Sequence, residues 1–174
     1  LHVNDSPGQF EFPGNSASAV FSDKRYVSEG GTLPADFCGA SAETLAAAEK
    51  GQAYTVIIPE NMEAELTISI TAEEDRPDFA GCFIFKLEKG AKLKLIWRLS
   101  GDRKHSVFAT ASSYELMENA VLSVSYLETG LPASSLYEQR CAVLGDDAKL
   151  DFVSAELGGE KVIVHSYGRL AGSR

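Results

Sequence analysis

The chain has 174 residues, 44% of them apolar, which is enough for one domain with a buried core. Its formal net charge is −9, and residues 1–80 hold 14 acidic but only 4 basic side chains. An acidic chain of this kind is a poor nucleic-acid binder, because phosphate neutralisation supplies most of that affinity. No apolar run approaches the roughly 18 residues needed to span a bilayer. The first residues also lack the basic and apolar regions of a secretory signal.

The three cysteines, Cys38, Cys82 and Cys141, are widely spaced and form no C-x-x-C pair. A zinc site normally uses paired ligands at short spacing, and a disulfide framework uses an even number of cysteines. Neither pattern is present. We therefore expect three reduced thiols in a cytoplasmic protein.

The segment 1–50 reads as a lead-in that ends in a short helix. Proline and glycine interrupt residues 1–40, which predicts an extended or loosely packed segment. Ser41 is a suitable N-cap for a helix over 42–50, and Gly51 stands where a C′ glycine is common. Such a helix could cap the first coil of a repeat protein.

From residue 54 onward the pattern predicts one strand after another. Strands that lead each repeat alternate with strands that start at an alanine, and tight turns separate them. The expected strands are 54–58, 64–70, 83–87, 91–99, 114–116, 120–126, 137–144, 148–153 and 162–170.

An alanine-led segment recurs four times in this region. Ala64, Ala91, Ala120 and Ala148 each begin a stretch with apolar residues two and four positions later, and they are 27, 29 and 28 residues apart. A fixed period of this size indicates stacked units that cannot bury their apolar faces alone. The sequence therefore predicts a right-handed parallel β-helix, or β-solenoid, of about 28 residues per repeat over residues 51–174.

The alternation within each strand predicts which side chains lie inside. Residues two apart in a strand share a face, so Ala91, Leu93 and Leu95 point one way while Lys92 and Lys94 point the other. We expect the first set to stack inside the coil and the lysines to face water.

The residues before the later alanines favour tight turns. Gly90, Asn119 and Asp147 are types that tolerate positive φ. A fifth alanine would fall just past Arg174, so we expect an incomplete last coil that self-associates through its exposed strand edge.

Three segments resemble the SUF-system iron–sulphur cluster assembly family of SufB and SufD. They are Leu-Glu-Lys-Gly-Ala-Lys-Leu at 87–93, Gly-Asp-Asp-Ala-Lys-Leu-Asp-Phe at 145–152 and Tyr-Gly-Arg-Leu-Ala-Gly-Ser at 167–173. The resemblance extends over residues 54–174. It implies a parallel β-helix that pairs with a related subunit and with the ATPase SufC to build nascent clusters.

Departures from the family pattern favour a SufD-like partner core, apparently truncated at the C-terminus, over a cluster-bearing SufB. The stretch 97–100 has no cysteine, whereas SufB has its sulphur-accepting cysteine after a comparable strand. The family's cluster-ligand region and its ATPase-docking helices lie beyond the last strand seen here. The resemblance thus implies no cofactor in this chain, and a transient cluster only in complex with a partner or a longer chain.

Few of the polar residues suggest a site. Cys141 and Cys82 lie in strands, and Arg140 faces away from Cys141, so buried structural thiols are favoured over reactive ones. His2, His105 and His165 share no metal-ligand spacing.

An acidic segment and a set of basic residues each allow both a functional and a structural interpretation. The carboxylates of 73–78 could attract a divalent cation, but their spacing is not that of an EF-hand, and a charged loop is favoured. A basic set could meet an acidic partner, although a solvated face is favoured. This set comprises Lys86, Lys89, Lys92, Lys94, Arg98, Arg103 and Lys104.

The sequence holds no nucleophile elbow, phosphate loop, dinucleotide fingerprint or zinc-protease motif. We therefore expect no catalytic, cofactor or metal residues, and a non-catalytic scaffold that resembles SufD. The alternative is a stand-alone solenoid module that binds protein or polysaccharide. A β-helix polysaccharide lyase is third, because no clustered acidic ligands with a basic residue are evident.

Overall fold

The computed structural model describes residues 17–35, 37, 48–73, 78–101, 106–129, 134–157 and 159–172. These residues are nearly all β, with 69% of them in strands and 2% in a helix. The strands are β1 (Ala19–Phe21), β2 (Val27–Glu29), β3 (Gln52–Ile58), β4 (Glu63–Ala72), β5 (Phe79–Leu87), β6 (Lys92–Gly101), β7 (Val107–Leu116), β8 (Val121–Thr129), β9 (Ser135–Leu144), β10 (Lys149–Leu157) and β11 (Lys161–Leu170).

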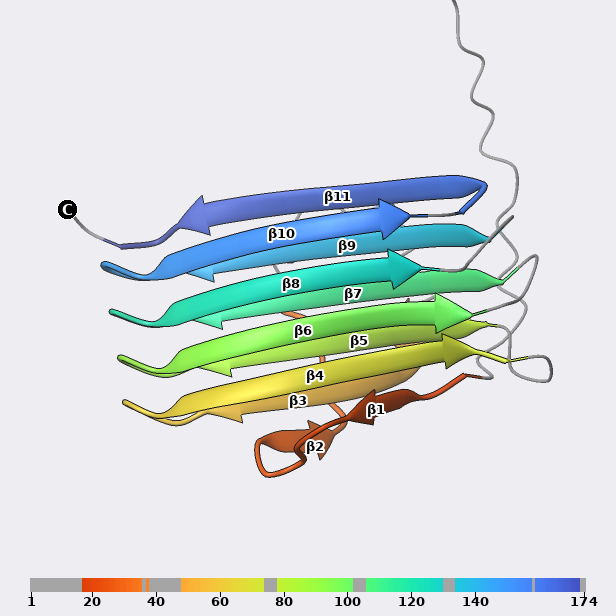
Figure 1. Cartoon of the computed structure of the whole chain (residues 1–174). Coiled ribbons are helices and arrows are strands. Elements are labelled where there is room, and N and C mark those ends of the chain that lie inside the picture. The colour runs from red at the N-terminus through yellow and green to blue at the C-terminus, as the bar shows by residue number, and fades with distance from the viewer. Residues whose placement is uncertain are drawn as a thin grey trace, which may run out of the picture.

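From β3 onward, successive strands alternate between two sheets. One sheet, sheet A, has the order β1-β4-β6-β8-β10, and the other, sheet B, has the order β11-β9-β7-β5-β3-β2. All neighbours from β3 to β11 pair in parallel. The chain thus forms a β-solenoid of about four turns with roughly 29 residues per turn. Figure 1 shows its coils stacked from β3 and β4 to β10 and β11. This confirms the predicted solenoid.

The register of β4 against β6 differs from the one predicted by equating Ala64 with Ala91. Ala64 pairs with Leu93, not with Ala91, and Leu93 pairs in turn with Leu122. The backbone N–H of Lys92 donates to the carbonyl of Met62 at 2.8 Å, so Met62 occupies the place of Ala91. The predicted equivalence of Ala64 was therefore wrong by two residues. Because side chains alternate with a period of two, this slip leaves every residue on its predicted face.

The turns before β4, β6, β8 and β10 repeat one backbone conformation. Asn61, Gly90, Asn119 and Asp147 have φ values of 55°, 67°, 58° and 53°. These turns also stack, because the backbone N–H of Asn61 donates to the carbonyl of Lys89 at 3.0 Å. The prediction that Gly90, Asn119 and Asp147 would favour such turns is confirmed, since glycine, asparagine and aspartate accept this conformation most readily.

The core lies between the two sheets. On β6, Leu93, Leu95 and Trp97 are at most 2% exposed, whereas Lys92 and Lys94 face outward, as the alternation predicts. Aromatic rings fill the middle of the first coils. Trp97 of sheet A meets Phe83 of sheet B edge-on, with 4.6 Å between ring centroids. Such edge-to-face contacts add stability beyond the buried area.

Two short antiparallel strands cover the N-terminal end of the solenoid. Ala19 of β1 pairs with Ile70 of β4, and Val27 of β2 pairs with Val56 of β3. They lie against the first coil in Figure 1. The sequence predicts an extended or loosely packed segment over residues 1–40, whereas the structure has two strands in it. They occupy the strand edges that would otherwise remain open.

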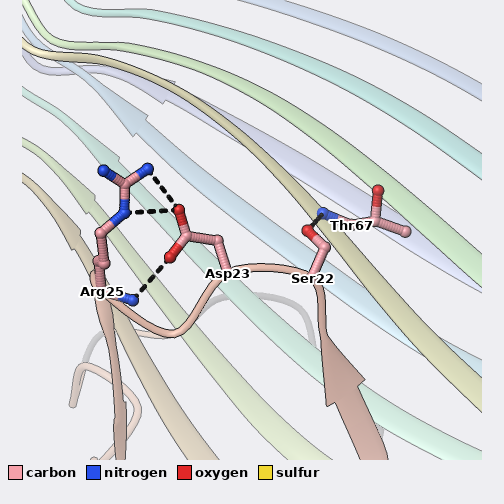
Figure 2. Close-up of polar contacts among 4 residues, drawn as sticks. All are labelled: Ser22, Asp23, Arg25 and Thr67. Carbon is pink, nitrogen blue, oxygen red and sulfur yellow. Dashed lines mark hydrogen bonds and ion pairs between the residues drawn. The ribbon is translucent and has the colours of Figure 1, made fainter.

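The turn between β1 and β2 is fixed by local polar contacts, which Figure 2 shows. The Ser22 hydroxyl accepts a hydrogen bond from the backbone N–H of Thr67 at 2.9 Å. The Asp23 carboxylate accepts from the backbone N–H of Arg25 at 2.9 Å and from its guanidinium at 2.8 and 2.6 Å. These bonds hold the turn beside β4.

Only the last residues of the predicted capping helix, 48–50, are described, and they are helical. Residues 41–47 lie outside the described ranges. Gly51 is not among the glycines with positive φ, so its expected role as a C′ glycine was wrong. A Cβ at Gly51 would overlap the carbonyl oxygen of Ala80. Glycine is needed there because two segments of backbone approach closely.

The opposite end of the core, at β10 and β11, is not covered by any described residue. Leu87, Leu116, Leu144 and Leu170 occupy one inward column of sheet B. Leu87 is fully buried and Leu116 is 2% exposed, but Leu170 is 81% exposed. In Figure 1 these two strands form the last coil of the stack. The solenoid therefore presents core residues at this end.

Candidate functional site

The interior of the solenoid changes from apolar to charged toward β9 and β10. On sheet B, Ser112 of β7 pairs with Arg140 of β9, and Thr110 pairs with Glu138. On sheet A, Glu128 of β8 pairs with Glu156 of β10. The corresponding residues of the earlier coils are apolar or small, so charge enters the core only in the later coils of the described chain.

Arg140 is the centre of this cluster. Its Nε donates to Glu138 Oε1 at 2.8 Å and its Nη2 donates to Glu138 Oε2 at 2.6 Å. The guanidinium carbon lies 4.7 Å from the centroid of the Tyr126 ring and 4.2 Å from that of Phe152. Nη2 also lies 3.5 Å from Glu156 Oε1. This combination of a bidentate ion pair and two aromatic faces holds the guanidinium in one orientation.

Burial shifts the proton affinities of the cluster. The side chains of Glu138 and Arg140 are only 1% and 7% exposed. Burial raises the pKa of Glu138, and the nearby Arg140 offsets only part of that effect. Burial alone would lower the pKa of Arg140, but the charge and hydrogen bonds of Glu138 together with Tyr114 and Tyr126 outweigh it, and the pKa is raised. Burial and the charge of Glu138 raise the pKa of Tyr126 well above its ordinary value.

Several buried polar atoms around this cluster have no hydrogen-bond partner within the described part of the chain. Native proteins leave few such atoms, so a concentration of them marks a candidate site. The atoms that line this interior are Trp97 Nε1, Thr110 Oγ1, Ser112 Oγ, the hydroxyls of Tyr114 and Tyr126, and both carboxylate oxygens of Glu128.

The sequence did not predict this site. The sequence analysis considered Arg140 only as the neighbour of Cys141, because a charged residue in the middle of a strand usually points to water. A signal was present, since Glu138 and Arg140 lie two and four positions after the buried Leu136 and therefore share its inward face.

The two described cysteines lie on the outer face of sheet B, not in the interior. Cys82 is 3% exposed and Cys141 is 5% exposed, and Arg140 points to the opposite face from Cys141, as expected. Burial, followed by the charge of Glu49, raises the pKa of Cys82 to about 12. A thiol with such a pKa is a poor nucleophile. Cys38 falls in a part of the chain that is not described.

Cys141 borders a cavity of about 270 Å³ between sheet B and the N-terminal segment. Its wall is mainly apolar. The lining residues are Pro34, Phe37, Ser113, Cys141, Val143, Tyr167, Gly168 and Arg169.

The histidines and the acidic segment do not assemble a metal site where the structure describes them. His165 is exposed on β11 and pairs in register with Gln139, whereas His2 and His105 lie outside the described ranges. Across the described residues, no three His, Cys, Asp or Glu side chains form a group that could hold a metal ion.

Glu73 and Asp78, the two described ends of the acidic segment, differ in environment. Glu73 is exposed, but Asp78 is buried and its Oδ1 accepts a hydrogen bond from the backbone N–H of Val107 at 2.8 Å. Burial raises the pKa of Asp78, and this bond partly offsets the shift. Asp78 thus connects neighbouring coils, and residues 74–77 lie outside the description.

Four lysines of the basic set form ion pairs with glutamates of adjacent coils. The Nζ to carboxylate distances are 3.3 Å for Lys86–Glu115, 2.7 Å for Lys89–Glu118 and 3.0 Å for Lys94–Glu65, and Lys92 pairs with Glu63. Arg98 is exposed, and Arg103 and Lys104 are not described. The pairs neutralise much of this surface, which supports the structural interpretation.

No helix in the described ranges is long and apolar enough to cross a membrane. Comparison of the chain with protein-family models, with curated proteins and with solved structures gave no match.

Proposed function

We propose that this chain is a non-catalytic scaffold subunit, resembling SufD, in cytoplasmic iron–sulphur cluster assembly. The observation that carries the proposal is a parallel solenoid whose turns repeat at Asn61, Gly90, Asn119 and Asp147. This order and spacing of turns is the feature on which the resemblance to the SUF family rests. A fold alone does not fix function, so the proposal also needs a surface for a partner.

The uncovered coil of β10 and β11 is the surface that best suits a related subunit. Within the described chain, β10 pairs only with β8 and β11 pairs only with β9. Open strand edges recruit further strands, and apolar core residues beside them add buried area. Leu170 is 81% exposed and Val162 is 40% exposed at this end. We place a SufB-like chain here, with a SufC-like ATPase in the same complex.

In this proposal the cluster is cargo of the assembled complex. A transient iron–sulphur cluster would be held by the partner, or jointly with it, and this chain would supply a rigid surface. The described thiols are consistent with that role, because Cys82 and Cys141 are buried on the outer face of sheet B. The exposed face of sheet A shows no aromatic row for a polysaccharide, since Trp97 and Tyr126 point into the core.

The proposal is tested by co-expressing the tagged chain with the SufB-like and SufC-like proteins of its source. We expect native mass spectrometry to identify a complex that contains all three. Leu170→Glu should abolish it, because a carboxylate cannot be buried there without a partner. Met117→Lys is the matched control, since Met117 is also exposed, at 59%, but lies in the turn before β8. Failure of the wild-type chain to bind either protein would refute the proposal.

A further inference from the structure

Glu128 occupies an unusual position inside the solenoid. Its residue is 1% exposed, no described side chain donates a hydrogen bond to its carboxylate, and the one described donor that acts on it is the backbone N–H of Leu157. Its neighbours in the column are Leu99 of β6 on one side and Glu156 of β10 on the other. An ionised carboxylate buried in this way is costly unless a cation or several donors compensate it.

The groups around Glu128 do not provide that compensation. Tyr126 lies two residues before it on the inward face of β8, and Glu156 of β10 is its register neighbour. The pair of Glu138 and Arg140 on β9 reaches this region through Arg140, which contacts Glu156 and the ring of Tyr126. Arg140 is the one cation among these groups, and it is already engaged by Glu138 and Glu156. Glu138 and Glu156 therefore share the guanidinium, and no ion pair among the described residues joins it to Glu128.

We propose that Glu128 is a proton-sensitive latch for the last coil: it is a neutral carboxylic acid while β10 covers it, and its ionisation favours release of β10 and β11. The covering strand brings Glu156 directly alongside Glu128, so ionising both places two negative charges side by side. Lifting β10 exposes Glu128 to water and removes this repulsion. Proton binding and coil packing are thereby coupled.

The pKa shift has the direction that the latch requires. Burial, and then the charge of Glu156, raise the pKa of Glu128 above its ordinary value of 4.5, and the backbone N–H of Leu157 offsets part of this. For a carboxyl group with a raised folded-state pKa, the stabilisation is complete below the ordinary value. It is lost as the pH rises through the folded-state value. The last coil should thus be closed in acid and loosen as the pH rises from the ordinary to the folded-state pKa.

The latch moves the coil to which the proposed function assigns the partner, but it involves only residues of this chain, so its test uses the chain alone. Hydrogen exchange, corrected for the intrinsic pH dependence, measures opening of β10 and β11 from about pH 5 to about pH 8. We expect the opening equilibrium of the wild-type chain to rise by up to about tenfold per pH unit between the ordinary and the raised pKa. Glu128→Gln keeps the size of the side chain but cannot ionise, so its opening should not change with pH.

Two further measurements make the test decisive. Glu118→Gln is the control, because Glu118 is exposed in a turn and should leave the pH dependence as in the wild type. A ¹³C carboxyl titration of the wild-type chain gives the pKa of Glu128 directly, even if the glutamine variant fails to fold. Equal pH dependence in wild type and Glu128→Gln, or a titration of Glu128 at or below its ordinary value, would overturn the latch.

Discussion

Arg140 and Glu138 lie two residues apart on the inward face of β9, and their side chains form a bidentate ion pair inside the solenoid. The pair lies between apolar coils on one side and the uncovered end of the core on the other. Buried pairs of this kind contribute little net stability, but breaking one leaves an uncompensated charge. Removing one partner of the pair should therefore cost more stability than removing both.

Arg140→Met should destabilise the chain by about 3–5 kcal/mol, because Glu138 would remain buried without its guanidinium. Chemical denaturation of the variant measures the loss. The double variant Glu138→Gln with Arg140→Met should recover much of it, since both charges are then removed. A loss below about 1 kcal/mol in the single variant would show that the pair is not buried as described.

Gly90→Ala should lower the free energy of unfolding by about 1–2 kcal/mol. Gly90 has a φ of 67°, and an added Cβ would overlap Asn61 Oδ1 in the turn of the coil before it. Asn119→Gly is the matched control, because Asn119 has a φ of 58° and glycine accepts that conformation without strain. Thermal unfolding compares the two. Equal stability of Gly90→Ala and wild type would contradict the stacked-turn architecture.

The thiol of Cys82 should resist labelling in the folded chain. With a pKa of about 12, roughly one thiol in ten thousand is ionised at pH 8, against about one in ten for an ordinary thiol of pKa 9.0. A thiol reagent applied to a Cys38→Ser variant measures this, with Cys141 also protected by burial. Guanidinium should then release two reactive thiols. Rapid labelling of Cys82 before denaturation would be inconsistent with its position.

Much of the solenoid could be predicted from its sequence because two local rules agree. Period-two alternation fixes the buried face of a strand such as β6, and turn residues such as Gly90 and Asn119 fix where each strand begins. Register is less well specified. Ala64 and Ala91 look equivalent, but a slip of two residues preserves every face, so hydrophobicity alone cannot detect the error.

The N-terminal strands and the interior site were missed for other physical reasons. Strands β1 and β2 have three residues each, and β1 pairs with β4, about 50 residues along the chain, so no local pattern marks them. On β9 both faces are buried from Glu138 to Ala142, because the N-terminal segment covers the outer side. The sequence of β9 therefore shows no apolar–polar alternation, and only the spacing of Arg140 from Leu136 indicates that it points inward.

The most direct test of the account is hydrogen exchange of the chain alone and in complex with its SufB-like subunit. If the coil of β10 and β11 is the partner surface, amides of these two strands should become protected in the complex. Those of β4 and β6, which are separated from β10 by β8 in sheet A, should not change. Protection confined to β4 and β6, or no protection in any strand, would contradict the assignment of the uncovered coil as the docking surface.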